Sequence, residues 1–506
     1  MKLESNMKKG KDDLPLQQVP IDKLDINMEV DLERALELCG VGRYQIFHCA
    51  LMVIILGAAM LEMIGSSFIL PAAACNLDIP DHLRGIITSI PNIGVILTAP
   101  FWGRAADTFG RKPVLLFSTA VAGVIALLAS FMPNLLSFAL CKFAGSLFLS
   151  CPSSLGFAYA GELMPRAKRD LAVLICNALL MLIASLCPIF AWGVLSINWQ
   201  TLGLQPWRVL TSVYATPLIL AAAWLTQAKE SPKFLMTKGK PGEALEVLRH
   251  IFSFNSRCEK NTYCVTSLQS EEDKSVDSEC AASGGSQTTW ALLRPPHLKW
   301  LILAGFLMFG LFSLLNGLFL FAPNTINKVM TQSNQPATIC MLMNQPENQT
   351  ADATCSDSIS YDTFQITAVT SVVYGVLVLL LSLSPLSKKA LLVGMYAAVG
   401  ANCLVSALTS NRIIAGISMS ALQITALGIG PLCAYTVQLF PTSLRGTAVG
   451  AVLMFGRLGS VTGANAAGIF LAGACTATFY GFAALLFLCA GLSFLLPRDQ
   501  PASKVG

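Results

Sequence analysis

The chain has 506 residues, of which 54% are hydrophobic and only 12% are charged, and its formal net charge is +5. Soluble domains carry about 25% charged residues. Since the mean hydropathy here is +0.62, the composition excludes a string of soluble domains and indicates a membrane protein. The charge is modest and no basic patch is interleaved with aromatic residues, which disfavours nucleic acid as a partner.

Twelve apolar segments are long enough to cross a bilayer as helices, since a span needs roughly 20 mostly apolar residues. They form two groups of six, separated by a polar stretch. In chain order they are Tyr44–Leu70, Ile86–Trp102, Pro113–Phe131, Leu135–Ala158, Leu171–Ile197, Trp207–Thr226, Trp300–Pro323, Phe364–Leu383, Ala390–Leu408, Ile413–Leu439, Thr447–Ala472 and Thr476–Leu496.

These segments predict an all-α membrane protein with about twelve transmembrane helices in two six-helix halves. The predicted parts are a polar tail (1–43), a first half (44–226), a linker (227–299), a second half (300–496) and a second tail (497–506). The first tail lacks the short apolar core of a signal peptide.

Lysine and arginine concentrate in the loops on one side of the predicted membrane, and such loops usually face the cytosol. The other side has little more than Arg84, Lys328 and Arg412. We therefore predict that both termini are cytosolic, with the chain in the plasma membrane or in an intracellular vesicle membrane. The short loops on the cationic side contain Arg104, Arg111, Lys112, Arg166, Lys168, Arg169, Lys388, Lys389 and Arg445.

The loop over residues 324–363, on the opposite side, contains the chain's one N-glycosylation sequon, at Asn348. Cys340 and Cys355 flank the sequon, and a disulfide is chemically permitted in such a compartment. Spacing in the sequence does not establish the geometry, so this pairing stays open.

The linker has apolar residues at helical spacing: Ala244, Leu245, Leu248 and Ile251–Phe252 fall on one face. This pattern predicts a short amphipathic helix under the bundle. Residues 267–286 are rich in Ser, Asp, Glu and Gly, a composition typical of disorder.

The two halves repeat a motif at a junction between helices. Glu162-Leu-Met-Pro-Arg-Ala-Lys-Arg169 follows the fourth span, and Gln438-Leu-Phe-Pro-Thr-Ser-Leu-Arg445 follows the tenth, so position 162 maps to position 438. Two repeated halves with a solute site between them near the midplane are a transporter architecture.

The loop after the second span reads Gly-Arg-Ala-Ala-Asp-Thr-Phe-Gly-Arg-Lys, from Gly103 to Lys112. Glycine suits a tight turn between helices, Asp107 can face a helix N-terminus, and Arg111 can meet a carboxylate across the gap between helices. This motif resembles the signature of the major facilitator superfamily, which implies the twelve-helix fold and transport.

Further motifs refine the resemblance. Lys229-Glu-Ser-Pro-Lys-Phe-Leu235 follows the sixth span, and Leu61-Glu-Met63 precedes Phe68-Ile-Leu-Pro71 in the first. With the two junction motifs, they resemble the branch that holds sugar porters, organic cation and anion transporters, and synaptic vesicle glycoprotein 2-like proteins. The first span is similar to the last group. Ala59 and Asn324 stand where relatives often carry acids, which leans toward weaker proton coupling or a role without transport.

The resemblance implies alternating access controlled by a cytosolic charge latch, which we expect to form in the inward-closed state. Because Gln438 is neutral, we expect a weaker latch on the second half. The residues expected to form the latch or shape its turns are Gly103, Asp107, Gly110, Arg111, Glu162, Arg169 and Glu230, with Gln438 and Arg445 at the repeated positions.

Ionisable residues inside the membrane are costly unless paired or hydrated, so each is a functional candidate. Glu62 can bind a cation or a proton, or hydrogen-bond to neighbouring helices. Lys142 can meet an anion, pair with Glu62 or extend outward. Arg457 can meet a substrate carboxylate or tie two helices together.

Three uncharged residues complete the predicted solute site. Trp192 and Phe321 offer aromatic faces for flat or cationic organic ligands, with packing as the alternative. Asn316 interrupts the apolar run of the seventh span.

No Walker motif, selectivity-filter run or metal-ligand cluster occurs in the sequence. We expect no enzyme activity, cofactor or metal site. The leading prediction is a transporter of a small organic solute, driven or not by a coupling ion, with the bilayer as its other partner. The alternative is a non-transporting vesicle-glycoprotein-like protein for binding or trafficking, and a sugar porter is third. The oligomeric state stays open.

Overall fold

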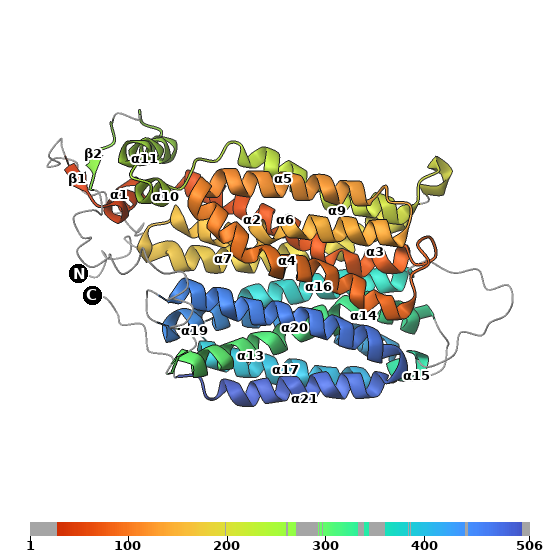
Figure 1. Cartoon of the computed structure of the whole chain (residues 1–506). Coiled ribbons are helices and arrows are strands. Elements are labelled where there is room, and N and C mark those ends of the chain that lie inside the picture. Colours follow the sequence, from red (N-terminus) through yellow and green to blue (C-terminus); the bar gives the residue numbers. More distant parts are fainter. Residues whose placement is uncertain are drawn as a thin grey trace, which may run out of the picture.

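The computed structural model has twelve helices that are long and apolar enough to cross a membrane (Figure 1). The chain is therefore an integral, multi-pass membrane protein with the predicted number of spans. The structure describes residues 28–197, 199–259, 262–269, 292, 294–295, 297–331, 338–343, 360–382, 384, 386–440 and 444–497.

Six spans form the N-terminal half. Its elements are β1 (Met28–Val30), α1 (Leu32–Cys39), α2 (Arg43–Ile64), α3 (Ser66–Ala72), α4 (Asp81–Phe109), α5 (Arg111–Ala129), α6 (Leu135–Glu162), α7 (Arg166–Ala184), α8 (Leu186–Leu195), the 3₁₀ turn η2 (Trp199–Leu202) and α9 (Pro206–Leu225). The first span comprises α2 and α3, and the fifth comprises α7 and α8.

The linker and the C-terminal half follow. Their elements are α10 (Pro232–Thr237), α11 (Pro241–Ser256), β2 (Val265–Leu268), α13 (His297–Asn316), α14 (Leu318–Thr331), α15 (Ile339–Met343), α16 (Tyr361–Ser382), α17 (Lys388–Leu408), α18 (Arg412–Ala421), the 3₁₀ segment η5 (Leu422–Gly428), α19 (Ile429–Leu439), α20 (Arg445–Gly473) and α21 (Cys475–Ser493). In Figure 1 the two halves lie one above the other, with α11 near one end of the bundle and α15 near the other. We name these the α11 end and the α15 end.

A glycine interrupts the first span of each half at a corresponding place. A Cβ atom on Gly65 would lie 2.5 Å from the ring of Tyr214 on α9, and one on Gly317 would lie 2.9 Å from the ring of Phe482 on α21. In both halves, the first helix thus packs closely against an aromatic ring on the last. Larger residues at either glycine would push these helices apart.

The halves contact each other toward the α15 end. A Cβ on Gly468 of α20 would lie 2.7 Å from the Cα of Gly85 on α4, so the two backbones nearly touch. Ser185 donates to the carbonyl of Ser371 (2.8 Å). Small residues at this boundary allow close helix packing, as they do between membrane helices in general.

A small layer of linker and N-terminal segments covers the α11 end of the N-terminal half. Helix α11 buries Ala244, Leu245, Leu248 and Ile251, which all lie on the face predicted from their spacing. Strands β1 and β2 pair in parallel. This layer ties residues near position 30 to residues beyond position 240.

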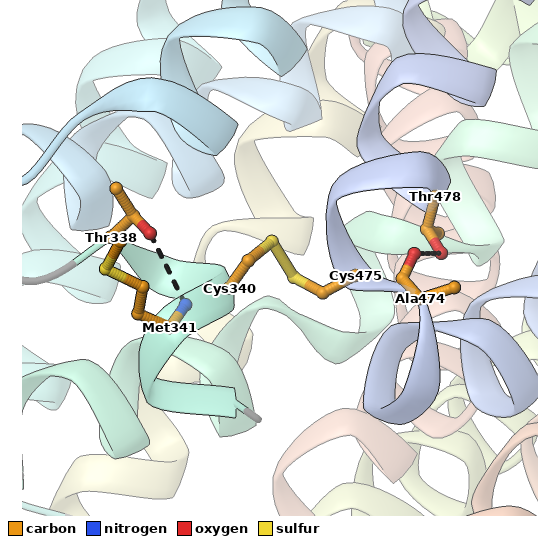
Figure 2. The surroundings of a disulfide bond; sticks show 6 residues. All are labelled: Thr338, Cys340, Met341, Ala474, Cys475 and Thr478. Atoms are coloured by element: carbon orange, nitrogen blue, oxygen red, sulfur yellow. Dashed lines mark hydrogen bonds between the residues drawn. A yellow bond between two sulfur atoms is a disulfide. The ribbon is translucent and has the colours of Figure 1, made fainter. Parts of the chain in front are cut away.

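The pairing of Cys340 with Cys355, which the sequence left open, does not form, because Cys340 is bonded to Cys475 (Figure 2). The two Cα atoms are 5.3 Å apart although 135 residues separate them in sequence. Helix α15 folds back over the start of α21, which brings the sulfur atoms together. Cys75 is also disulfide-bonded. Cys355 and Asn348 lie outside the described residues.

We expect Cys340→Ser and Cys475→Ser to lower stability by similar amounts, about 2–4 kcal/mol, because each releases the same covalent tie. The double variant should be no less stable than either single one. Thermal unfolding in detergent, without and with reductant, measures this effect. Additive losses in the double variant would contradict the pairing.

Candidate functional site

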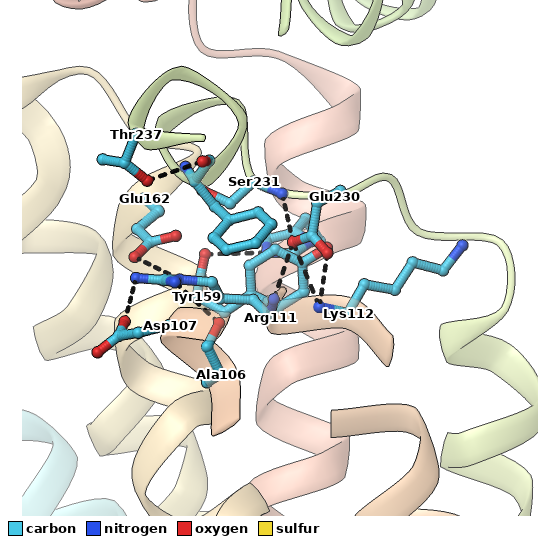
Figure 3. A network of polar contacts seen from close by, with 11 residues as sticks. Ala106, Asp107, Arg111, Lys112, Tyr159, Glu162, Glu230, Ser231 and Thr237 are labelled. Carbon is cyan, nitrogen blue, oxygen red and sulfur yellow. Dashed lines mark hydrogen bonds and ion pairs between the residues drawn. The ribbon is translucent and has the colours of Figure 1, made fainter. Parts of the chain in front are cut away.

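Arg111 gathers several polar groups at the α11 end of the N-terminal half (Figure 3). Its guanidinium contacts Asp107 (3.0 Å) and Glu162 (3.2 Å) and donates to the carbonyl of Ala106 (3.0 Å). It also lies over the ring of Phe234 from α10 (5.1 Å). Since Asp107 is largely exposed, Glu162 is the stronger of the two ion-pair partners.

Glu230, just after α9, binds backbone rather than a cation. Its carboxylate accepts from the N–H groups of Arg111 (3.1 Å), Lys112 (3.2 Å) and Ser231 (2.8 Å). These N–H groups include the first of α5, where a helix favours an anion. Burial raises the pKa of Glu230, and the three N–H donors oppose that rise. The carboxylate thus caps α5 and holds the linker to it. We call Asp107, Arg111, Glu162 and Glu230 the Arg111 cluster.

Gly110 makes the turn into the Arg111 cluster. Its φ is +109°, a conformation that L side chains rarely adopt, and a Cβ there would overlap a carboxylate oxygen of Glu230. Gly103, seven residues earlier, has open space around its Cα and lies inside α4. Only one of the two predicted motif glycines is therefore required by the geometry.

Tyr159 and His48 extend the polar contacts, and sequence reasoning assigned Tyr159 no role. The Tyr159 hydroxyl donates to the carbonyl of Lys229, while the Lys229 N–H donates to the hydroxyl of Tyr44 (3.1 Å). A ring nitrogen of His48 is 3.1 Å from the carbonyl of Tyr159. The start of α2 and the end of α6 are thus tied to the segment before α10.

Arg169, predicted as part of the latch, is not a partner of the Arg111 cluster. Its guanidinium pairs with Glu33 of α1 (2.8 Å) and donates to the carbonyls of Gly161 and Met164. The physical reason is that Glu33 of α1 presents a carboxylate to this junction, which the helix-junction motif alone does not reveal.

The C-terminal half has no counterpart of Arg111. The motif repeat, 162 to 438, maps Arg111 onto Ser387, whose hydroxyl caps α17 by accepting from Ala390 N–H (3.2 Å). Gln438 is exposed near the end of α19, and Arg445 begins α20. The Arg111 cluster therefore lies in the N-terminal half and the start of the linker, and its described contacts do not join the two halves.

Deeper in the bundle, Glu62 of α2 pairs with Lys142 of α6. Both side chains are at most 5% exposed, and the ammonium also lies over the Phe138 ring (5.6 Å). The second carboxylate oxygen of Glu62 is buried and has no hydrogen-bond partner among the described residues. The pair, one of the alternatives foreseen from the sequence, joins two helices of the N-terminal half.

Arg457 of α20 reaches across the boundary between the halves. Its guanidinium donates to the amide oxygen of Asn92 on α4 (3.2 Å) and lies over the ring of Phe312 from α13 (5.6 Å). Ser89 lies four residues after Gly85 on α4, and its hydroxyl accepts a hydrogen bond from the side-chain amide of Asn465 on α20 (2.8 Å). Asn92 and Ser89 were not predicted, because neutral polar residues stand out less than charges. Their spacing along one face of α4 was the available signal.

The uncharged candidates lie in several places. Asn316, at the end of α13, donates to the hydroxyl of Ser460 on α20 (2.9 Å). Phe321 is buried in α14, and Trp192 contacts the ring of Tyr361 on α16 (5.9 Å between centroids). Asn316 therefore contacts the same helix, α20, on which Arg457 lies. Within the described part of the chain, no contact joins Asn316 or Arg457 to the Glu62–Lys142 pair.

A family model described as "Major Facilitator Superfamily" matches residues 51–346, more than half of the chain. Synaptic vesicle glycoprotein 2C of Rattus norvegicus is 31% identical over 231 residues, which cover 44% of this chain and 32% of the relative. Synaptic vesicle glycoprotein 2A of Homo sapiens is 27% identical over 256 residues, with 48% and 34% covered. The matched segment thus spans about a third of the length of these relatives.

Solved structures share the fold. The xylose transporter XylE from E. coli, in a partially occluded inward-open conformation, superposes with a TM-score of 0.65 at 16% identity, covering 90% of this chain and 100% of that one. A D-xylose–proton symporter gives 0.61 at 14% identity, with 90% and 99% covered.

Gly110→Ala should destabilise the N-terminal half by about 2 kcal/mol or more, because the turn is strained for any residue with a Cβ and Glu230 must move. Gly103→Ala is the matched control, and we expect it to be neutral or to gain about 0.5–1 kcal/mol from better helix propensity. Thermal unfolding of both variants measures this difference. Equal midpoints would contradict the assigned role of Gly110.

Replacing only one member of the Glu62–Lys142 pair should be costly. Glu62→Met or Lys142→Met leaves a buried unpaired charge, which should lower the free energy of unfolding by about 3–5 kcal/mol. The double variant should recover most of that loss. A double-mutant cycle on unfolding measures the coupling. If the two single losses add in the double variant, the side chains do not interact in the folded protein.

Proposed function

Because the chain belongs to the major facilitator superfamily, we propose that it carries a small organic solute across its membrane by alternating access. The two halves rock about a solute site near the midplane, which opens to one side at a time. The family and the fold are those of transporters rather than of enzymes.

The observation that carries this proposal is the environment of Arg457. The residue is only half-buried despite its depth in α20. It donates to the neutral Asn92, and no carboxylate is ion-paired with it among the described residues. A guanidinium at the boundary between the halves, without an acidic partner, suits the carboxylate of a solute. The adjacent Phe312 ring suits a flat apolar body. We therefore favour an organic anion.

The buried pair of Glu62 and Lys142 is our candidate for ion coupling. Glu62 keeps one carboxylate oxygen without a hydrogen-bond partner in the described residues, and a proton taken up there would release Lys142. Buried ionisable groups of this kind mark ion pathways in transporters. This role is separate from solute recognition at Arg457, because the two sites lie on different helices.

We propose that the α11 end faces the cytosol. The loop cations gather there, and the Cys340–Cys475 disulfide at the α15 end suits an oxidising compartment. In that orientation the close contact between Gly85 and Gly468 lies on the outer side.

Similarity to synaptic vesicle glycoproteins 2A and 2C supports a second candidate function. In this alternative, the chain keeps the fold for binding or trafficking in a vesicle membrane and moves no solute. A sugar porter is the third candidate and is supported by the shared fold with XylE.

Uptake into proteoliposomes tests these candidates, using aromatic carboxylates, organic cations and hexoses, each with and without an imposed proton gradient. We expect saturable uptake of the carboxylates. Arg457→Ala should weaken apparent affinity about 10- to 100-fold, since it removes a hydrogen bond to a charged group. Glu62→Gln should reduce the response to the proton gradient. Arg104→Ala, which removes an exposed arginine of α4, is the matched control.

The outcomes separate the candidates. Uptake of carboxylates that survives Arg457→Ala would remove the proposed role of that residue. Uptake confined to hexoses would favour the sugar porter. Folded protein that moves none of the three classes would favour the role without transport.

A further inference from the structure

A chain of aromatic rings connects the membrane-spanning helices to α11. Trp224, at the end of α9, contacts Phe47 of α2 (5.7 Å between centroids), and Phe47 contacts Tyr44 (6.3 Å). Tyr44 in turn contacts Phe254 of α11 (5.8 Å). Because Tyr44 is the second residue of α2, Phe254 lies level with the ends of the spans. Aromatic rings are enriched at this depth, where hydrocarbon meets headgroups.

Phe254 is an exposed member of this chain. It is 47% exposed, whereas Tyr44 beneath it is 2% exposed. One turn into α2, Ile46 is 68% exposed and lies at the start of the first candidate membrane span. The apolar surface of the spans therefore continues onto the end of α11.

Two arginines flank the same place. The side chain of Asn255 accepts from the N–H of Tyr44 (2.9 Å) and donates to the carbonyl of Cys39 (3.2 Å). Asn255 thereby joins the start of α2, which begins at Arg43, to the end of α11, which is followed by Arg257. Both arginines are exposed, and neither guanidinium group has a hydrogen-bond or ion-pair partner among the described residues, although the backbone N–H of Arg257 donates to the carbonyl of Ser253 (3.0 Å).

We propose that Arg43, Arg257 and Phe254 bind the headgroup of an acidic phospholipid in the leaflet at the α11 end. The two guanidinium groups take the phosphate oxygens, which arginine binds with directed, charge-assisted hydrogen bonds. Phe254 packs against the glycerol and upper acyl region. We name these three residues the α2–α11 corner.

Charge and position both favour a lipid over a soluble acidic protein. Glu259 is exposed and follows Arg257 by two residues. The charges of Arg43, Arg257 and Glu259 therefore sum to only +1. Binding must then come from directed contacts together with the apolar surface that Phe254 and Ile46 share with the spans. A soluble acidic partner would not need an aromatic ring at membrane depth.

The α2–α11 corner does not depend on whether the chain transports a solute, so its test is separate from the uptake experiment. The purified full chain in detergent is titrated with phosphatidylglycerol or phosphatidylcholine, and bound lipid is counted by native mass spectrometry. We expect preferential binding of phosphatidylglycerol. Arg43→Ala combined with Arg257→Ala should weaken it by roughly tenfold to thirtyfold, and Glu259→Gln should strengthen it.

The matched control removes two other exposed cations at the same end, Arg104→Ala with Lys233→Ala. It should leave phosphatidylglycerol binding within about twofold of the unaltered chain, because Arg104 and Lys233 lie outside the corner. Phe254→Ser should weaken lipid binding without changing the charge. Thermal unfolding verifies that each variant is folded, and Arg257→Ala alone replaces the double variant if that one is not.

Three results would overturn the proposal. The first is equal binding of the two lipids. The second is an equal loss of phosphatidylglycerol in the control variant. The third is that soluble polyglutamate displaces phosphatidylglycerol and binds the Phe254→Ser variant as tightly as it binds the unaltered chain. That pattern would indicate an acidic protein as the partner.

Discussion

The cost of an unpaired charge in hydrocarbon is the constraint on which the arrangement of these helices most depends. The buried carboxylate of Glu62 forms an ion pair with Lys142, and this pair joins α2 to α6. The guanidinium of Arg457 donates a hydrogen bond to Asn92, and this bond joins α20 to α4. A soluble protein can leave such groups to water. Here each of them selects which helices become neighbours, and glycine contacts then determine how closely those helices approach.

The two halves repeat their shape more faithfully than their charges. Gly65 and Gly317 face aromatic rings on the last helix of their own half, so the same close approach is built twice. Arg111, by contrast, corresponds to Ser387, which serves only as a helix cap. The charged contacts described at the α11 end are therefore concentrated on the side of the N-terminal half.

Much of the fold could be predicted from the sequence because the signal is local. Hydropathy alone gives twelve spans, and the 3.6-residue period gives the buried face of α11. The motif of the Arg111 cluster was visible for the same reason, since its glycine, acid and cations are close in the chain.

The partners were harder to predict, because they depend on contacts between distant segments. The partner of Cys340 lies 135 residues away, and that of Arg169 lies in α1 before the first span. Asn92 carries no charge, so only its position on α4 hinted at a role. A sequence therefore identifies costly groups inside the membrane more readily than it identifies the residues that satisfy them.

The parallel pairing of β1 with β2 also constrains the order in which the protein can be assembled. Val30 lies opposite Leu268, so the first described strand has no partner until six spans have left the ribosome. At roughly 5–20 residues per second, this segment waits on the order of ten seconds or more beside the membrane. The completed layer over the α11 end therefore forms only after the six spans of the N-terminal half have been synthesised.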